Sequence, residues 1–600
     1  MNLPPFCNSV QTPVDQSAAI RSTLSKAIVL TILLITTPWA PSLMSATEPG
    51  NAAAKTTTLR LDATQAKGGN IIQTDKGHSA VFFQPAAPVK DKIVWKLDQP
   101  LPAGLWRVDL EFYQPESPFS PDQMLLFEGA GGEVLGNLNL YYIGFTKGTF
   151  TRSVGFYSDK PLAAVALLKS GQRNLDTVSV ISITLTPATA ATMDKLQFIF
   201  QLPVTGQHAT SPIPLPTGVY VVNTATPVAL RWDLPGGRNF TTPLSGETRV
   251  YLDQPAQPVL VGGEAVRSIA LMRYPLAESP QMEVAGNPPL MTVTDPAKVE
   301  THTLVLTGYR GSGVPKLDLL PGGKPVAVVT SWDDGPLSDF PLSECLNQYG
   351  VKGTLYMNHG SPVVSRLREL EAKGMEIGSH SWSHAAFYNS SPKRCLDEAA
   401  EMRRFLEKEL GHPVISFAYP FNYQPAYDAE GDYVLRSLRQ AGYWSGRVTT
   451  NGDNRIDAIP EPLEMRPNFH FKAAGARTPA KFEELLQKPG SIYYIWGHSY
   501  ELAGDGKKIL EEDLAIVAHR PDVWYATLGE LTVWQFLRNQ LKIEGAAATM
   551  NGQAFTLKMP WLHPYLRQVP MSLTLPEGVK SVSWDGKSLP VVDQRVQLTW

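Results

Sequence analysis

The hydrophobic pattern of the N-terminal half consists of short alternating segments. Apolar and polar residues alternate over stretches such as Trp106–Phe112 and Val178–Leu185, and Gly and Pro separate these stretches. Such alternation is typical of strands with one buried face, and strands at this spacing favour sandwich-like folds. An Ala- and Thr-rich stretch at 187–192 indicates a boundary. We therefore predict a β-sandwich module over residues 51–190 and a second all-β, sandwich-like region over residues 191–322.

After residue 325 the pattern changes to strands alternating with helices. Short apolar runs predict strands at 326–332, 353–357, 375–379, 414–419, 442–447, 491–497 and 523–527. Seven such strand–helix units in series predict a mostly parallel sheet, either a barrel or a doubly wound sheet. We assign this domain to residues 323–541, and a small β-rich C-terminal region to residues 542–600.

The clearest helix of this domain runs from Pro392 to Leu410. Ser391 is suited to cap its first turn, Pro392 fits the first helical position, and Gly411 fits the position just after the end.

The N-terminal 50 residues carry a targeting pattern. Arg21 and Lys26 precede an apolar run from Ala27 to Ile35, which is shorter than a membrane-spanning helix requires. The pattern predicts a signal peptide or an uncleaved signal anchor within residues 1–50. We therefore expect an exported protein, located in the periplasm, at the cell surface or outside the cell, with no integral membrane domain beyond this segment.

Composition narrows the class of partner. Charged residues make up 18% of the chain and the formal net charge is −3, so a nucleic acid partner is not expected. The 50 Pro and 47 Gly residues favour turn-rich β-modules over long helices. Cys345 and Cys395 both fall in predicted helices, and either a disulfide or two buried thiols is compatible with the sequence.

Two short motifs carry the candidate chemistry. Asp333 and Asp334 directly follow the first predicted strand, and His380 and His384 stand four residues apart, a spacing that places both imidazoles on one face of a helical turn. One aspartate and two histidines form a facial set of ligands for a divalent metal such as zinc, with positions left for water and substrate. The second aspartate is then available as a base toward that water.

The candidate residues share one feature of position. Asp333 and Asp334 end the first strand, His380 the third, Pro420 the fourth and His498 the sixth. In parallel α/β folds, catalytic groups gather at the carboxyl ends of the strands, so we expect these side chains to lie together.

With these motifs in order, residues 325–540 resemble the catalytic domain of polysaccharide deacetylases of the NodB-homology class, carbohydrate esterase family 4. The resemblance implies a distorted (β/α)7 barrel and the metal-dependent removal of acetyl groups, usually N-acetyl groups, from sugars. It also implies that Asp333 is the catalytic base and that Asp334, His380 and His384 bind the metal.

The same resemblance assigns the remaining site residues. Pro420 and Phe421 fall in the third motif, where the backbone N–H after the proline helps to hold the oxyanion. His498 matches the general acid that protonates the leaving amine. Trp496, two residues earlier, could narrow the pocket for the acetyl group.

The chain departs from the family in two motifs. The third motif usually begins with an arginine that orients the base, and here that position is Ala418. The fourth motif usually supplies an aspartate that tunes the acid histidine, and Arg447, Asp453 and Asp457 offer no clear match. Asn468 and His470 follow a short apolar stretch and are further candidates to face the site.

The sequence thus predicts an exported, metal-dependent hydrolase that removes acetyl groups from a polysaccharide. Zinc is the first expectation for the metal, with cobalt and other ions as alternatives. Two other functions remain open: an amidohydrolase of the same fold that acts on a small non-sugar C–N bond, and a non-catalytic polysaccharide-binding protein. The β-modules are expected to present polymer to the catalytic domain or to hold it near its substrate.

Overall fold

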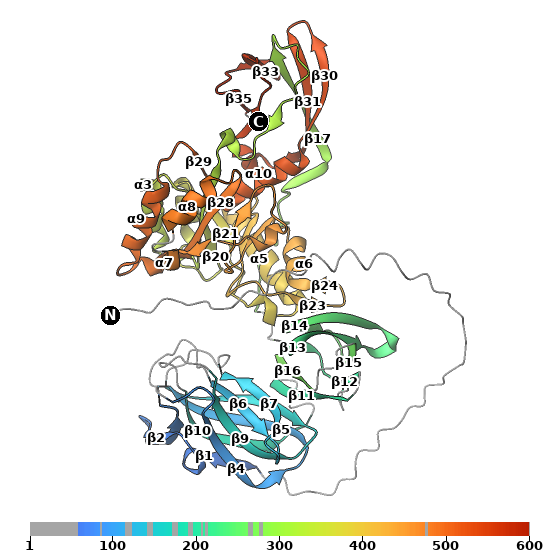
Figure 1. Ribbon diagram of the computed structural model, residues 1–600, viewed down its shortest axis with the longest axis vertical. Coiled ribbons are helices and arrows are strands. Elements are labelled where there is room, and N and C mark those ends of the chain that lie inside the picture. The colour runs from blue at the N-terminus through green and yellow to red at the C-terminus, as the bar shows by residue number, and fades with distance from the viewer. Residues whose placement is uncertain are drawn as a thin grey trace, which may run out of the picture. The chain divides into compact units, whose positions relative to one another are not determined.

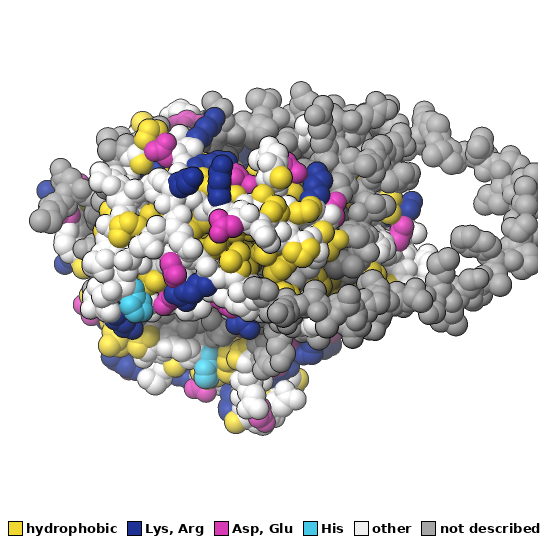
Figure 2. Space-filling view, turned by 90° about the horizontal axis from the view of Figure 1, so that it is seen from below, with side chains coloured by type: hydrophobic (Ala, Val, Ile, Leu, Met, Phe, Trp, Pro, Cys, Tyr) yellow, Lys and Arg dark blue, Asp and Glu magenta, His cyan; other side chains and the backbone are white. Residues whose placement is uncertain are grey.

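The computed structural model describes residues 58–598, apart from 85–86, 115–122, 141–147, 171–177, 190–195, 206–207, 210–213, 262–267, 275, 277–279 and 475–477. The predicted signal segment, residues 1–50, lies outside these residues and stays a prediction. Among the helices that the structure describes, none is both long and apolar enough to cross a membrane. On the face shown in Figure 2, acidic and basic side chains are interspersed with neutral ones.

The first β-region consists of two sheets that enclose one core (Figure 1). One sheet has the order β4 (Lys92–Leu101), β9 (Leu162–Lys169), β6 (Gln123–Glu128) and β7 (Val134–Asn139). The other has the order β2 (Asn70–Gln73), β3 (Ser79–Phe82), β10 (Ser179–Pro187), β5 (Gly104–Gln114) and β8 (Gly148–Ser158), with β1 (Leu59–Asp62) also on β10. The rings of Phe127 and Phe156 stack between the sheets with centroids 4.1 Å apart. This is the packing expected of a β-sandwich.

The second sheet continues into the next β-region. Its further strands are β11 (Gln197–Thr205), β16 (Ser268–Tyr274), β13 (Gly218–Asp233) and β14 (Asn239–Leu252), with β12 (His208–Ala209) and β15 (Gln257–Val261) at its sides. Strand β14 pairs in parallel with β23 (Ala426–Asp428), which forms a hairpin with β24 (Gly431–Asp432). The β-region is therefore hydrogen-bonded to a segment that lies within the predicted catalytic domain.

The catalytic region is built on a mostly parallel sheet. Its order is β25 (Ser445–Arg447), β22 (Ser416–Ala418), β21 (Glu376–Ser379), β20 (Thr354–Met357), β19 (Val326–Asp333), β28 (Ser491–His498) and β26 (Asn454–Arg455). In addition, β27 (Phe469–His470) pairs with β28, and β29 (Val523–Tyr525) pairs with β19. All eight residues of β19 are buried, as expected of a central strand covered on both faces.

Helices alternate with these strands. They are α3 (Asp339–Gln348), α4 (Leu367–Ala372), α5 (Pro392–Leu410), α6 (Tyr433–Gln440), α7 (Phe471–Ala474), α8 (Thr478–Leu486), α9 (Gly506–Val517) and α10 (Leu528–Gln540). The predicted bounds of α5 are confirmed: Ser391 accepts a hydrogen bond from the Arg394 N–H, and Gly411 ends the helix in a left-handed conformation at φ 79°. Cys345 in α3 and Cys395 in α5 are both buried free thiols.

The closed seven-unit ring stays a prediction, because the sheet is joined across its last gap by an irregular segment. Met465 forms an isolated parallel bridge to Arg447 of β25, and the Asn468 N–H donates to the Tyr494 carbonyl of β28. Residues 465–470 thus connect β25 and β28 through a few contacts rather than through a long paired strand.

The C-terminal β-region recruits a strand from well before the catalytic domain. Strand β17 (Thr294–Thr307) lies between β31 (Gly552–Leu562) and β33 (Ser581–Trp584), with β30 (Lys542–Thr549) and β34 (Lys587–Leu589) outside them. A small sheet of β18 (Lys316–Leu317), β32 (Met571–Thr574) and β35 (Arg595–Leu598) accompanies it. The predicted division at residue 322 therefore separates strands that are neighbours in the structure.

Candidate active site

The predicted base and acid stand side by side at the ends of two neighbouring strands. Asp333 is the last residue of β19, His498 is the last residue of β28, and the two are register partners in this parallel pair. Residues at the same level of adjacent parallel strands project to the same face of the sheet. The structure thus brings both side chains to the carboxyl edge of the sheet, as the sequence predicts.

A tight turn after β19 separates Asp334 from Asp333. Asp334 and Gly335 both adopt left-handed backbone conformations, with φ of 76° and 58°. A Cβ at residue 335 would lie 2.3 Å from Met357 Sδ, so only glycine fits there. Ser361 Oγ donates to the Asp334 carbonyl at 2.6 Å and fixes the turn.

The prediction that His380 and His384 share a helical turn is wrong. They lie in a loop after β21, in which Ser381 and His384 have φ of 63° and 58°. The loop is fixed instead by α5, because the Trp382 N–H donates to the Glu398 carbonyl at 3.1 Å and the Ser383 N–H to the Glu398 carboxylate at 2.7 Å. These bonds to the neighbouring helix replace the hydrogen bonds that a helical turn would have made.

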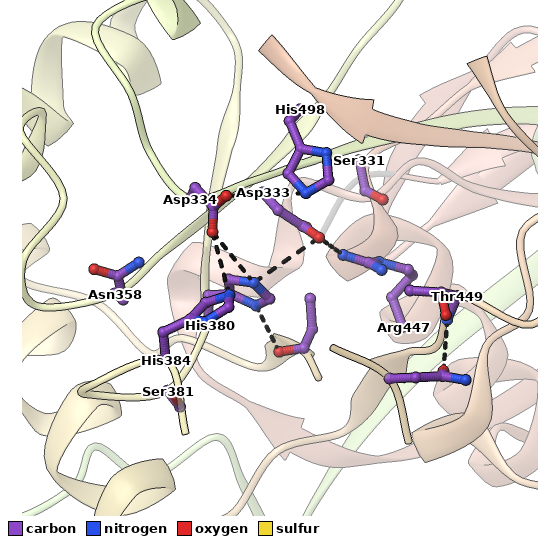
Figure 3. A network of polar contacts seen from close by, with 12 residues as sticks. Ser331, Asp333, Asp334, Asn358, His380, Ser381, His384, Arg447, Thr449 and His498 are labelled. Atoms are coloured by element: carbon purple, nitrogen blue, oxygen red, sulfur yellow. Dashed lines mark hydrogen bonds and ion pairs between the residues drawn. The ribbon is translucent and has the colours of Figure 1, made fainter. Parts of the chain in front are cut away.

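The loop nevertheless brings the two imidazoles onto Asp334. Asp334 Oδ1 lies 3.6 Å from His380 Nε2 and 3.4 Å from His384 Nε2, and the three side chains converge in Figure 3. His380 is buried, whereas about a third of the His384 side chain and of the Asp334 side chain is exposed. The group is therefore anchored on its inner side and accessible on its outer side.

The donor set fits a small divalent metal. Ligands bound tetrahedrally at about 2.1 Å lie about 3.4 Å from one another, close to the two separations above. His380 Nδ1 lies 2.9 Å from the Ala418 carbonyl and donates to it, which leaves the Nε2 lone pair for the metal. Burial lowers the pKa of His380 to about 4, so the ring is neutral, as a ligand must be.

Asp333 is held by a buried cation. Its side chain is almost fully buried, and its Oδ2 forms an ion pair with Nη2 of Arg447, which is itself fully buried. Burial alone would raise the pKa of Asp333, but the charge of Arg447 outweighs it and holds that pKa below its usual value. Asp333 Oδ1 has no hydrogen-bond partner among the described residues.

Arg447 contacts the predicted base from β25. The family's third motif would place its arginine on the neighbouring strand β22, at residue 418. Arg447 is the register partner of Ala418 in β22. In Figure 3 the guanidinium approaches Asp333 from the side opposite His380 and His384. Ala418, where the family usually has arginine, and Arg447, which contacts Asp333, are therefore cross-strand neighbours.

His498 contacts a carboxylate that the sequence interpretation missed. His498 Nδ1 lies 3.1 Å from Glu501 Oε2, and its Nε2 lies 3.9 Å from Asp334 Oδ2. His470 Nε2 lies 2.9 Å from the same Glu501 oxygen. The spacing of Glu501, three residues after His498 at the start of the 3-10 helix η9 (Ser499–Leu502), is a capping-box pattern that could have revealed it.

Aromatic residues surround the predicted ligands. Phe421, directly after the buried Pro420, is 61% exposed and meets the His384 ring edge-on with centroids 4.8 Å apart. Trp496 lies 4.5 Å from the Arg447 guanidinium, which stacks over its ring. Both thus lie beside the site: Phe421 contacts the predicted ligand His384, and Trp496 contacts the arginine that pairs with the predicted base.

Strained backbone concentrates at this site. Ten described residues other than glycine have a positive φ, and four of them lie at this site: Asp334, Ser381, His384 and Phe421. Such conformations cost energy and cluster where a fold must place functional groups.

Three other candidates from the sequence lie elsewhere. Asp453 pairs with Lys481, and Asp457 pairs with Arg455 near the surface. The Asn468 amide bridges Tyr494 of β28 to Gly452 and Asp453, so it is committed to the sheet edge. Of the five residues that the sequence left without an assigned role, the structure brings Arg447 and His470 into the site.

Comparison with known protein families identifies part of the region that carries these residues. Residues 321–444 match the family model described as polysaccharide deacetylase. This segment belongs to the polysaccharide deacetylase family. The deacetylase segment contains Asp333, Asp334, His380, His384 and Phe421, while Arg447, His498 and Glu501 lie beyond it.

Two curated relatives match part of the chain. A peptidoglycan-N-acetylglucosamine deacetylase of Bacillus cereus is 24% identical over 147 residues, which are 24% of this chain and 64% of that protein. A chitin deacetylase of Pestalotiopsis sp. is 30% identical over 125 residues, which are 20% of this chain and 40% of that protein. The chain thus spans less than two thirds of the length of either relative.

Among solved structures, the chitin deacetylase of the fungal pathogen Colletotrichum lindemuthianum superposes with a TM-score of 0.26 at 17% identity, covering 35% of this chain and 89% of that one.

Proposed function

We propose that this chain is an exported, metal-dependent hydrolase that removes acetyl groups, above all N-acetyl groups, from a polysaccharide. The observation that carries the proposal is the arrangement around Asp333. A buried carboxylate, one oxygen of which has no partner among the described residues, lies beside three residues that could hold a metal and is the register partner of His498 on the adjacent strand. This combination offers a base, an acid and a Lewis-acid position within one small region.

The proposed base is Asp333. Arg447 keeps its carboxylate ionised despite burial, and Oδ1 is the oxygen left to accept a proton. Water attacks the acetyl carbon as Asp333 Oδ1 takes its proton, so a C–O bond forms while an O–H bond breaks.

The proposed metal ligands are Asp334, His380 and His384. A divalent ion held by them, with zinc as the first expectation, would supply Lewis acidity toward the attacking water and the acetyl carbonyl. The backbone N–H of Phe421 is proposed to stabilise the negative charge that develops on the carbonyl oxygen.

The proposed acid is His498. Burial alone would lower its pKa, but the hydrogen bond to Glu501 raises the pKa above its usual value and favours the protonated ring. The C–N bond breaks as His498 Nε2–H passes to the departing nitrogen, which is a poor leaving group without that proton. Trp496 is proposed to limit the space for the acetyl group.

The relatives support the substrate class. The curated proteins that match part of this chain are named for peptidoglycan N-acetylglucosamine and for chitin. Both names refer to polymers that contain N-acetylglucosamine, which makes such polymers the first substrates to try.

The test is acetate release from a panel of N-acetylglucosamine polymers by the zinc-loaded full chain, with Asp333→Asn alongside. We expect release by the parent and a loss of at least about 100-fold in the variant. Release from small amides but from no polymer would reject the polysaccharide substrate in favour of a small-molecule amidohydrolase. Polymer retention that Asp333→Asn leaves intact, with no acetate release by the parent, would identify a binding protein instead.

A further inference from the structure

Glu501 lies at the centre of a hydrogen-bonded group on the acid side of the site. Its Oε2 accepts from the His498 backbone N–H at 3.0 Å, from His498 Nδ1 at 3.1 Å and from His470 Nε2 at 2.9 Å. Roughly a fifth of each of these three side chains is exposed. One carboxylate oxygen of η9 thus binds the last residue of β28 and the last residue of β27 at the carboxyl edge of the sheet.

The contacts fix the protonation pattern of both rings. The Lys472 N–H donates to His470 Nδ1 at 3.3 Å, so that nitrogen holds a lone pair and His470 Nε2 carries the hydrogen that points at Glu501. His498 Nδ1 likewise carries its hydrogen toward Glu501. The other nitrogen of His498, Nε2, is therefore directed toward Asp334 and the reacting centre.

The same pattern distinguishes this group from a second metal site. His470, His498 and Glu501 have the residue types and the proximity of a ligand set. However, both imidazole nitrogens that face Glu501 carry hydrogens, and separations of 2.9 and 3.1 Å are those of hydrogen bonds. The group is therefore a hydrogen-bonded support for His498.

Two aromatic contacts restrict the rings further. Tyr500 stacks on His498 with centroids 5.0 Å apart, and Trp496 meets His470 edge-on at 4.7 Å. The hydrogen bonds from both histidines outweigh burial and hold the pKa of Glu501 far below its usual range, so the carboxylate stays ionised.

We propose that Glu501, itself held by His470, is the positioning residue for the acid: it fixes the His498 ring with Nδ1–H on the carboxylate and Nε2 toward the departing nitrogen. This inference rests on the proposed function, since it assigns the support of the proposed acid. In the reaction, the Nε2 hydrogen moves to the nitrogen as the C–N bond breaks, while the Nδ1 hydrogen remains shared with Glu501.

The experiment compares two leaving groups in the zinc-loaded full chain. An N-acetylglucosamine oligomer and acetanilide release amines, which must be protonated, whereas 4-nitrophenyl acetate releases a phenolate that departs without an acid. In Glu501→Gln and Glu501→Ala, the ratio of amide to aryl ester turnover should fall at least about 10-fold, as it should in His498→Ala. His470→Ala should lower the ratio by a smaller factor, because it removes one of three bonds to the same oxygen.

The matched control is Glu371→Gln. Glu371 forms the same kind of pair, with His412 Nε2 at 2.6 Å, away from the site. This variant should keep the parent's ratio. A merely structural role for Glu501 would lower both turnovers together, and an unchanged ratio in both Glu501 variants would overturn the inference.

Two results separate this inference from the proposed function. If the parent cleaves acetanilide and the aryl ester but no acetylated polymer, the proposed polysaccharide substrate is rejected while the ratio still tests Glu501. A crystal structure of zinc-loaded Glu501→Ala needs no activity at all. The His498 ring should leave the orientation that it has in the parent, and a ring that stays in place would overturn the inference.

Discussion

At the scale of single residues, the ion pair of Asp333 and Arg447 has the largest consequence. Both side chains are buried, so the pair is not screened by water and each charge depends on the other. Arg447→Met would leave the carboxylate buried without its cation.

We expect Arg447→Met to lower the free energy of unfolding by about 3–5 kcal/mol and to lower deacetylation by roughly 100-fold. Urea titration and acetate release measure the two effects. Arg455→Met is the control, because its pair with Asp457 is exposed and should change stability by less than about 1 kcal/mol. A variant at Arg447 as stable and active as the parent would contradict this account.

Asp339 gives the stability a pH dependence. This buried first residue of α3 accepts a hydrogen bond from Ser499, and burial raises its pKa from 3.8 to about 7. Between these values the folded chain holds a proton that the unfolded chain has lost, so stability falls as pH rises through this window.

Asp339→Asn should remove that fall. The unfolding free energy of the variant relative to the parent should rise by roughly 2–4 kcal/mol from pH 4 to pH 8, as measured by urea titration at each pH. The sign is specific to a raised carboxyl pKa. A difference between variant and parent that is constant with pH would show that Asp339 does not titrate in this window.

The sequence could identify the residues whose roles depend on local position. Asp333, Asp334, His380 and His498 were predictable because each ends an apolar strand. The role of Arg447 was not, because it depends on which residue of β25 lies beside Ala418 of β22. That register is set by packing between strands that are separate in sequence.

At the scale of elements, α5 holds in place the loop after β21 that carries His380 and His384. Glu398 of this helix is fully buried and receives both the N–H and the hydroxyl of Ser383, one residue before His384. The bounds of α5 could be predicted from its caps. Its contact with the loop could not, and that contact is why the four-residue histidine spacing does not form a helical turn.

Glu398→Gln should weaken metal binding about 10-fold, since an amide offers one acceptor oxygen where Ser383 needs two. Zinc affinity measured against a competing chelator gives the readout. Glu401→Gln on the same helix, where Glu401 pairs only with Arg404 among the described residues, should leave the affinity unchanged. Equal affinities for both variants would contradict the anchoring role.

The pairing of β22 with β25 suggests that the arginine could be moved from residue 447 to residue 418. Ala418 and Arg447 are cross-strand partners, so a guanidinium on either strand starts from a similar place. The double variant Ala418→Arg, Arg447→Ala should recover at least about 10-fold of the acetate release lost in Arg447→Ala alone, because the base regains its cation. No recovery would mean that only β25 directs the side chain correctly.

At the scale of the whole molecule, β17 links distant parts of the chain. It pairs with β31 from Thr294↔Leu562 to Thr307↔Gly552, and it carries the fully buried Leu304 and Leu306. The sequence predicted an all-β region there, but pairing across some 250 residues leaves no mark in the local sequence.

A chain cut to begin at residue 323 should therefore unfold without cooperativity or aggregate, because β31 becomes an exposed edge. A chain cut to begin at residue 286, which keeps β17, should show a sharp thermal transition. Both cuts remove β14, which makes them a matched pair. Indistinguishable melting curves would show that β17 is dispensable.

The Ala418–Arg447 neighbourhood bears on how relatives of this chain are sorted. A scan that demands arginine at the start of the third motif would discard this chain as inactive. Yet the guanidinium arrives at the same carboxylate from one strand further along the sheet. Genome surveys that separate active enzymes from inactive homologues should therefore look for arginine at both of these neighbouring strand positions, rather than at one position of the sequence alignment.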